Sequence, residues 1–238
     1  MNRFAAFFKS KKMKTKIIIA YSILFSAIIS CNKEIKSEKG GIDVISNVYL
    51  NASQGLDKMK TFHLSRLSYS NDTILEIVPD IEFPEMNGEM YFITDSLYYS
   101  LGLTNASRTV FAEIVKKQKP NDITKKTTGT LFLKEWIPNY KNKKNLPDTI
   151  LFKKNYKRFE VNSPWSYARF YIYPTDTILP YSIYKHAEVD YGGRLERIDS
   201  YNKKEDIFVT LQLIPRKNWD DEAKEIFDYN HYIKNRKK

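Results

Sequence analysis

Residues 207–213 read Ile-Phe-Val-Thr-Leu-Gln-Leu, and this stretch decides the class of fold that we expect. Successive side chains of a β-strand point to opposite faces of its sheet. An apolar residue at every second position therefore indicates a strand with one buried face. The apolar positions are Ile207, Val209, Leu211 and Leu213. We predict a strand over residues 205–214.

Stretches of similar character fill much of the chain before residue 205. The sequence contains 17 Tyr, 14 Phe and 3 Trp, and aromatic and β-branched residues favour strands. The tetrapeptide Asp-Thr-Ile-Leu occurs at 72–75, 148–151 and 176–179, where aspartate suits a turn and the following residues begin a strand. The predicted strands are 61–70, 73–78, 89–94, 96–101, 108–115, 128–136, 149–153, 156–161, 167–173, 186–191 and 194–201.

The connections between these strands are polar or rich in glycine. Gly192 and Gly193 link the strands 186–191 and 194–201 in our prediction, because glycine tolerates the positive φ of a two-residue hairpin. Residues 116–127 and 139–145 are basic and polar, and we expect them to form loops.

One helix is expected at each end of this β-rich region. Near the N-terminal end, apolar residues recur at intervals of three and four, which is the spacing of one helix face. These residues are Ile42, Ile45, Val48, Tyr49, Ala52, Leu56 and Met59. At the C-terminal end, Asn218 can cap a helix whose first turn is acidic and whose last turn is basic. The apolar stripe of this second helix is Trp219, Ala223, Ile226, Phe227 and Ile233.

A basic and then apolar leader opens the sequence. Residues 1–16 contain six basic residues and no acidic one, and residues 17–30 carry no charge. A bilayer-spanning helix needs about 20 apolar residues, so this shorter stretch fits the apolar core of a secretory signal. Met1 and Met13 can each start such a leader, and the sequence leaves this choice open.

Cys31 is the only cysteine of the chain, and its position is informative. The residues Ile28-Ile29-Ser30-Cys31 resemble the bacterial lipobox, in which the cysteine is acylated and becomes the first mature residue. The resemblance implies that residues 1–30 are a lipoprotein signal peptide and that Cys31 carries more than one acyl chain, palmitate among them. Because a single chain anchors only marginally, the implied modification gives a stable membrane anchor.

Residues 31–41 are expected to form a flexible tether, because they are charged and end in two glycines. The lysine and glutamate that follow the cysteine resemble the surface-export signals of Bacteroidota lipoproteins. We expect the protein in the cell envelope, at the outer membrane rather than the inner one. The sequence leaves open whether it lies on the periplasmic face or on the surface face of that membrane. Residues 42–238 are then a single mostly-β domain.

Net charge excludes one class of partner. The whole chain has a formal net charge of +11, but residues 1–30 hold six of the 39 basic residues and none of the 28 acidic ones. The mature part therefore carries +5, and four of its basic residues lie in 234–238. We expect no nucleic-acid binding and only a mild attraction to anionic surfaces.

Four stretches resemble the LolA/LolB and LppX-type lipoprotein fold. They are the joint at 57–62, the tyrosine-bearing stretch at 89–99 and the late stretches 179–184 and 190–195. That family folds a curved antiparallel sheet around helices and carries acyl chains or lipoproteins in the hollow. The resemblance implies an α+β fold, mostly antiparallel β, with a curved sheet or half-barrel between the N-terminal and C-terminal helices.

Two strand faces offer candidate binding residues. Tyr167, Arg169, Tyr171 and Tyr173 share one face of a predicted strand, and such aromatic and basic residues can bind glycan, peptide or a lipid headgroup. A solvated face whose tyrosines cover their neighbours explains the same pattern. His186, Glu188 and Asp190 also share a predicted strand face and form a weak metal candidate, against which a solvated face ending in a turn is the simpler interpretation.

No motif for catalysis is present. The chain lacks a Gly-x-Ser-x-Gly elbow, a His-Glu-x-x-His pair and a phosphate-binding glycine loop, and no pattern calls for a cofactor. We therefore expect a non-catalytic, lipid-anchored envelope protein that binds an apolar or amphipathic ligand or an envelope protein. Two alternatives stay open: a structural or assembly subunit without a small ligand, and a hydrolase with an unrecognised site.

Overall fold

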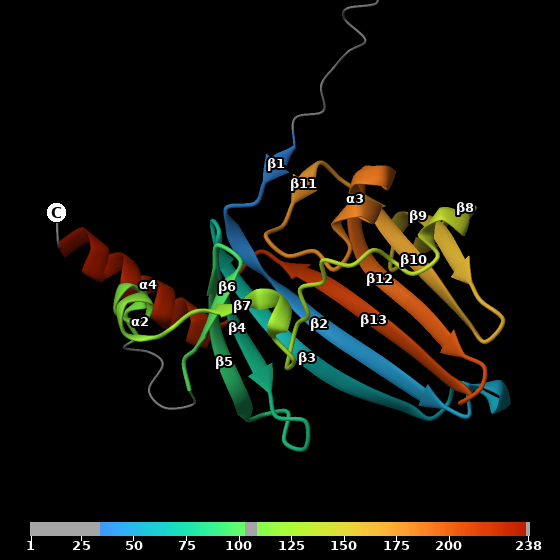
Figure 1. The fold of residues 1–238 in the computed structure, drawn as a ribbon, viewed down its shortest axis with the longest axis horizontal. Helices are drawn as coiled ribbons and strands as arrows, with labels where there is room; N and C mark the ends of the chain where they lie inside the picture. The colour runs from blue at the N-terminus through green and yellow to red at the C-terminus, as the bar shows by residue number, and fades with distance from the viewer. Residues whose placement is uncertain (1–33, 103–108, 237–238) are drawn as a thin grey trace, which may run out of the picture. The chain divides into compact units, whose positions relative to one another are not determined.

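A large antiparallel sheet dominates the structure, which is a computed structural model describing residues 34–102 and 109–236. Within this part, 11 strands pair in the order β7-β6-β5-β4-β3-β2-β13-β12-β10-β9-β8 (Figure 1). The sheet is curved but does not close on itself. The predicted class, α+β with mostly antiparallel β-structure, is confirmed.

The elements have the following bounds. The large sheet contains β2 (Lys39–Leu50), β3 (Met59–Ser70), β4 (Thr73–Pro79), β5 (Asn87–Thr94), β6 (Leu97–Ser100), β7 (Asn121–Asp122), β8 (Lys144–Leu151), β9 (Lys154–Asn162), β10 (Ser166–Pro174), β12 (Gly193–Asn202) and β13 (Ile207–Arg216). A separate parallel pair joins β1 (Ile35–Lys36) to β11 (Thr177–Ile178). The helices are α2 (Phe111–Lys117), α3 (Lys185–Tyr191) and α4 (Asp221–Arg236), with 3₁₀ turns η1 (Ala52–Gln54), η3 (Ile123–Lys125) and η4 (Tyr140–Asn142).

Most of the predicted strands are present. The predicted strand 205–214 corresponds to β13. The predictions at 61–70, 73–78, 89–94, 96–101, 149–153, 156–161, 167–173 and 194–201 correspond to β3, β4, β5, β6, β8, β9, β10 and β12. Of the three Asp-Thr-Ile-Leu copies, the first and third do start strands, β4 and β11. The second lies inside β8, at a shift in its register with β9.

The predicted N-terminal helix is wrong, because residues 39–50 form β2. This strand lies in the middle of the sheet, between β3 and β13. Ile42 and Val44 are buried on one face, while Ile45 on the other is half-buried. A central strand can carry apolar residues on both faces, and this mixture imitated the spacing of a helix. Asp43 of this strand forms an ion pair with Arg216, with Oδ1 2.8 Å from Nε.

The folded part also begins earlier than predicted. Residues from Ile35 onward belong to one compact unit, so residues 35–41 of the expected tether are not a free linker. Ile35 N donates a backbone hydrogen bond of 2.8 Å to Asp176 O. Gly40 and Gly41 are buried in β2. A Cβ at Gly41 would lie only 2.9 Å from Leu67 O of the neighbouring strand, so a larger residue would not fit there. These glycines permit close strand approach and do not loosen the chain.

Two further predicted strands are helices. Residues 111–117 form α2, where Phe111 stacks on Phe92 with ring centroids 4.3 Å apart. Residues 185–191 form α3, and Gly192 has a φ of 60° at its C-terminal end. The positive φ that suggested a hairpin at Gly192 therefore ends a helix instead.

The predicted C-terminal helix is present as α4. Three residues of its predicted stripe, Ala223, Ile226 and Phe227, are buried, whereas Trp219, just before the helix, and Ile233 are half-buried. Ala223, Ile226 and Phe227 pack against Leu75 and Ile77 of β4. The cap differs from the prediction: Asp220 Oδ1 accepts a hydrogen bond of 2.9 Å from Ala223 N, so Asp220 and not Asn218 caps the helix.

The sheet has two faces, which we name by what covers them. The loop face carries the larger apolar core and is covered by residues 123–140 and 177–191. The helix face is covered by α4 only over β3, β4 and β5. Over β9, β10, β12 and β13 the helix face carries no described helix (Figure 1).

Candidate functional site

Residues 123–140, which we call the strap, cross the loop face of the sheet (Figure 1). We predicted a strand over 128–136, and this prediction is wrong, because these residues form no strand in the described structure. Phe132 packs against the core, while Leu131 and Leu133 on either side of it are exposed. The alternation of Leu-Phe-Leu thus marks a single inward contact of an irregular segment.

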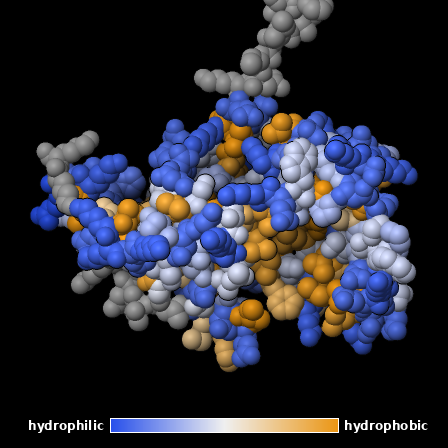
Figure 2. Space-filling model, in the orientation of Figure 1, coloured by the Kyte–Doolittle hydropathy of each residue, from blue (hydrophilic) through white to orange (hydrophobic). Residues whose placement is uncertain are grey.

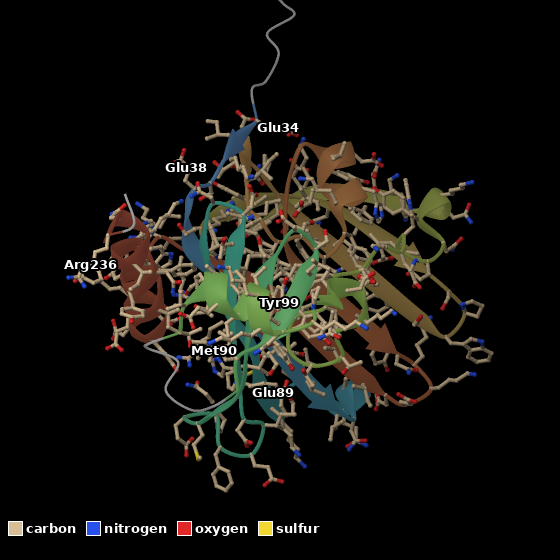
Figure 3. The ribbon with its side chains drawn as sticks, turned by 60° about the vertical axis from the view of Figure 1, so that its left-hand side comes forward. Glu34, Glu38, Glu89, Met90, Tyr99 and Arg236 are labelled. Carbon is tan, nitrogen blue, oxygen red and sulfur yellow. The ribbon has the colours of Figure 1, made fainter. Side chains whose placement is uncertain are left out.

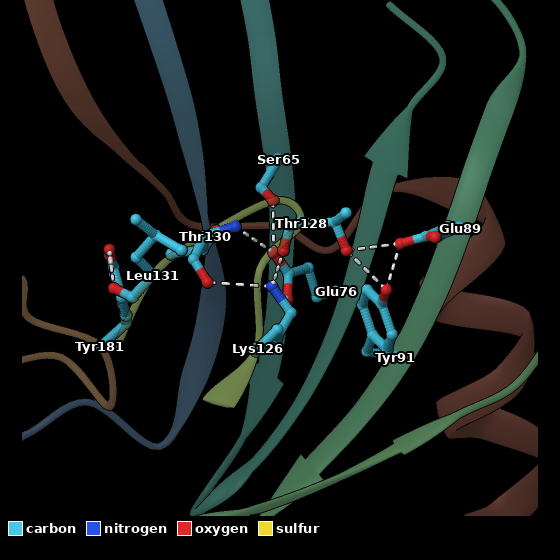
Figure 4. A network of polar contacts seen from close by, with 9 residues as sticks. All are labelled: Ser65, Glu76, Glu89, Tyr91, Lys126, Thr128, Thr130, Leu131 and Tyr181. Carbon is cyan, nitrogen blue, oxygen red and sulfur yellow. Dashed lines mark hydrogen bonds and ion pairs between the residues drawn. The ribbon is translucent and has the colours of Figure 1, made fainter. Parts of the chain in front are cut away.

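A buried ion pair fixes the N-terminal half of the strap to the sheet. Lys126 Nζ lies 2.8 Å from Glu76 Oε2 of β4, and neither side chain is more than 1% exposed. Thr130 N donates a 2.6 Å hydrogen bond to Glu76 Oε1, which also accepts one from Ser65 (Figure 4). Burial lowers the pKa of Lys126, although the attraction of Glu76 opposes that shift. The pair holds the strap in one position on the sheet.

A second polar group continues from this pair toward solvent. Thr128 Oγ1 lies 2.6 Å from both Glu89 Oε2 and Tyr91 Oη, and Tyr91 also donates to Glu89 (Figure 4). Burial, reinforced by the hydrogen bond to Glu89, raises the pKa of Tyr91 to about 12. The hydrogen bonds from Thr128 and Tyr91 lower the pKa of Glu89. Tyr91 therefore stays protonated and Glu89 stays anionic at neutral pH.

Gly129 lets the strap approach the ion pair. Its φ of 66° is unfavourable for other residues. A Cβ at this position would lie 2.5 Å from Glu76 Oε1 and 2.8 Å from Ser65 Oγ. Only glycine fits between the strap backbone and the buried carboxylate.

Helix α3 holds the C-terminal half of the strap. The His186 ring stacks on Trp136 at a centroid distance of 4.3 Å and meets Tyr140 edge-on at 4.7 Å. Tyr140 Oη donates a 2.9 Å hydrogen bond to Asp190 Oδ2. Burial lowers the pKa of His186, and the neutral ring can accept the 3.5 Å contact from Ile137 N at Nε2.

The strand face predicted for His186, Glu188 and Asp190 does not exist, because the three residues lie on α3. Residues two apart on a helix point in different directions. Glu188 accepts a hydrogen bond of 3.1 Å from Leu195 N, whereas His186 and Asp190 contact the strap. No group of three His, Cys, Asp or Glu side chains within residues 34–102 and 109–236 could hold a metal ion.

A first cleft of about 500 Å³ opens on one side of the strap. Apolar side chains of β3 and β4 line it, among them Phe62, Leu64 and Val78. Ile81 of the β4–β5 turn stands at its edge, and the strap contributes residues 127–129. Glu89 supplies a negative charge at the strap side.

A second cleft of about 380 Å³ opens farther along the strap. Ile137 and Pro138 of the strap lie over Ala168, Phe170 and Ile198 of the sheet. The polar groups of this cleft are the uncharged side chains of Asn139, Asn162, Ser163, Ser166 and Ser200. Figure 2 shows apolar surface in the centre of this face, next to the strap. Both volumes lie within or near the 300–1,000 Å³ that is usual for small-molecule sites.

Tyr167, Arg169, Tyr171 and Tyr173 lie together on the helix face, away from the strap, as their alternation in β10 requires. Arg169 Nη2 lies 2.6 Å from Glu160 Oε2, and its guanidinium lies 5.8 Å from the Tyr167 ring centroid. Tyr171 is buried. The arginine is therefore paired within the fold, and the binding role of these four residues stays a prediction.

Two observations concern membranes. Cys31, the predicted site of lipid attachment, lies outside the described residues. Among the helices that the structure describes, none has the length and apolar character needed to cross a bilayer.

Sequence reasoning missed Glu76 and Lys126. A signal for Glu76 exists, since it is the one charged residue in Ile74-Leu75-Glu76-Ile77-Val78 and a buried charge needs a partner. Lys126 gave no such signal, because Lys125 beside it has the same character but is exposed.

Comparison with known proteins gives low similarity. No family model matches the chain, and no curated protein matches it. Among solved structures, it is similar to a domain assigned to outer membrane lipoprotein sorting from Vibrio parahaemolyticus, at 11% identity over 84% of this chain and 93% of that chain, with a TM-score of 0.28. A DUF1329 family protein from Desulfovibrio piger matches at 11% identity over 78% of this chain and 87% of that chain, with a TM-score of 0.19. These TM-scores are too low to support an argument about function.

Proposed function

We propose that the protein is a non-catalytic, lipid-anchored cell-envelope protein that binds an apolar or amphipathic ligand on the loop face of its sheet. One observation carries this proposal: the strap is fixed over the sheet and borders two largely apolar clefts, one at residues 127–129 and one at residues 137–139. The anchor is the acylated Cys31 inferred from the sequence, and the expected location is the outer membrane.

The fixed strap gives the site its affinity in this proposal. A pre-formed cleft saves the ordering cost that a mobile segment incurs on binding. The Lys126–Glu76 pair holds one half of the strap, and the contacts of His186 and Tyr140 hold the other. The ligand then displaces water from apolar walls without a large rearrangement of the chain.

The polar edges of the clefts define the head group that fits. Asp80 and Glu89 border the first cleft, and the second offers hydroxyl and amide groups. A ligand whose polar end carries amine or hydroxyl groups complements these edges better than an acidic one. The apolar body of the ligand would lie along the walls described above.

Native mass spectrometry of the protein purified from bacteria tests this proposal. We expect an added mass that is lost on denaturation and identified as an amphiphile. The variant Ala168→Trp, which fills the second cleft, should lower the occupied fraction, whereas Ala112→Trp on the exposed side of α2 should not. A clean protein mass that persists after lipid is added would reject ligand binding.

A second candidate function is the docking of a partner protein, and the β4–β5 turn favours it. Ile81, Phe83 and Met86 are 79%, 53% and 59% exposed on this one turn, and exposed apolar patches often mark interfaces. Figure 3 places Glu89, just beyond this turn, toward the opposite end of the fold from Glu38. A photoreactive residue at position 83 should crosslink to one protein in cells if this function holds, and to no protein if it does not.

A further inference from the structure

A third cleft, of about 360 Å³, lies on the helix face of the sheet, away from the strap. Tyr156, Arg197 and Gln212 line it from β9, β12 and β13. Arg197 and Gln212 are register partners and share the helix face, and the Tyr156 ring meets Tyr171 and Tyr173 of the same face. Its remaining walls are mainly apolar, with Leu151 and Phe152 of the β8–β9 hairpin facing Ile214 and Pro215 of β13. Nothing in the proposed function uses this cleft.

The charges at this cleft leave a positive excess. Glu196 is its one acidic lining residue, and its carboxylate is already satisfied. Oε2 accepts from Lys154 Nζ at 3.0 Å and from Tyr156 Oη at 2.8 Å, and Oε1 accepts from Arg194 Nη2 at 2.6 Å. Arg197 Nε binds Asp199 at 2.6 Å.

Two cations therefore keep donors for a ligand. Lys154 and Arg197 both line the cleft, and their side chains have three and five N–H donors. The contacts described above use one donor of each. Three cations, Lys154, Arg194 and Arg197, stand against two carboxylates in this cluster, so an anion complements it better than a cation.

The turn that carries Phe152 gives an independent reason to expect a ligand. Leu151 pairs with Lys154 across a two-residue turn, in which Phe152 and Lys153 have φ values of 50° and 64°. Such turns favour Asn and Gly, and a bulky residue is strained there. Phe152 is also 71% exposed, so it adds little packing to the fold. Strained residues of this kind concentrate at functional sites.

We propose that this third cleft binds an anionic amphiphile: an apolar body lies against Phe152, Leu151 and Ile214, and an acidic group meets Lys154 and Arg197. The site lies on the other side of the sheet from the strap clefts, which favour amine or hydroxyl head groups. The two sites thus differ in the charge of the ligand that they accept.

The test uses 8-anilinonaphthalene-1-sulfonate, an aromatic probe with one sulfonate, and follows amide signals of the ¹⁵N-labelled protein by NMR. We expect the probe to shift the amides of residues 151–154 and 212–214 and to bind more weakly as salt is added. The variant Phe152→Asn removes the ring but suits the turn, so it should fold at least as well as the original chain. Its affinity for the probe should fall by about tenfold, as for the loss of an aromatic anchor.

Matched variants separate this site from the others. Phe83→Asn removes another exposed ring, outside the third cleft, and should leave the shifts at 151–154 unchanged. Lys154→Gln should weaken binding and reduce its salt dependence. Shifts confined to the strap clefts, or unchanged affinity in Phe152→Asn, would overturn the proposal while leaving the proposed function of the loop face intact.

Discussion

At the scale of single residues, the buried Glu76–Lys126 pair need not stabilise the fold. Removing two charges from water is costly, and a buried pair often stabilises a fold no more than apolar residues would. What this pair supplies is position: Lys126 Nζ also donates to Thr128 O and, at 2.9 Å, to Thr130 O of the strap. Lys126 Nζ and Thr130 N of the strap thus both contact Glu76 on the sheet, while Lys126 also binds two carbonyl groups of the strap itself. Loss of one partner should cost far more than loss of both.

The variant Lys126→Met tests this asymmetry. Methionine approximates the length of lysine but leaves the Glu76 carboxylate buried and unpaired, so we expect a loss of about 3–5 kcal/mol in the free energy of unfolding. The double variant Glu76→Gln with Lys126→Met should recover much of this loss, because glutamine still accepts hydrogen bonds from Ser65 and Thr130. Denaturation in urea gives the free energy of unfolding of the original chain, the single variant and the double variant. Equal losses in the single and double variants would contradict the role of the pair.

His186 should make stability depend on pH. Burial lowers the pKa of His186 below its ordinary value of 6.5, while Asp190 opposes this shift and Lys143 adds to it. The neutral ring is therefore favoured in the folded protein. Its stabilising effect is complete above pH 6.5 and is lost as the pH falls through the lower folded value.

The measurement is the free energy of unfolding between pH 7.5 and pH 5, compared with that of His186→Phe. Phenylalanine keeps the stacking on Trp136 but cannot take up a proton. We expect the variant to lose less stability on acidification than the original chain. Parallel profiles for the two proteins would show that His186 does not contribute.

At the scale of elements, prediction succeeded where one face of a strand is buried and failed where the surroundings decide. β13 was predictable from its own alternation of Ile207, Val209, Leu211 and Leu213, although it has a paired strand at each edge. β2 also has a paired strand at each edge, but its apolar residues lie on both faces and do not alternate cleanly. In α3, Ala187 is buried and Gly192 has the positive φ that ends the helix. Both features depend on the packing of α3 against the neighbouring β12, so the local sequence does not reveal them.

Helix α4 was predictable because its stripe and its charges agree. Phe227 is 2% exposed, meets Phe111 and stacks on Trp219. We expect Phe227→Ala to lower the free energy of unfolding by about 3–5 kcal/mol, as for other buried aromatic residues. Tyr232→Ala, on the exposed side of the same helix, should change it by less than about 0.5 kcal/mol. Thermal unfolding measures the stability of both variants. A loss in Phe227→Ala alone would show that packing stabilises α4, whereas similar changes in both variants would point to helix propensity.

At the scale of the whole molecule, we expect the proposed anchor at Cys31 and the proposed binding face to act independently. The variant Cys31→Ala should move the protein from the membrane fraction to the soluble fraction of cells, because the proposed acyl chains would be lost. Labelling with palmitate should disappear in the same variant. Ligand binding by the loop face should be retained, and palmitate labelling that persisted would contradict the assignment of Cys31.

The candidate site was less predictable than the fold. The tyrosines and Arg169 of β10 were placed on a common face by alternation alone. The strap clefts, in contrast, join β3 with residues 127–129 and β10 with residues 137–139. Such long-range contacts depend on the path of an irregular segment, and no local pattern specifies that path. Phe152 gave no signal either, because its unusual φ is visible only in the folded hairpin.

The first and last strands of the large sheet are neighbours at its centre, since β2 pairs with β13 over residues 41–50 and 207–216. A chain made from its N-terminal end can close β2 onto β3 early, but the other edge of β2 must wait for residue 216. For most of its synthesis the chain therefore exposes an unpaired edge on an apolar strand, which invites pairing with other chains. A protein built in this order depends on being kept apart from its own copies until its last strand arrives.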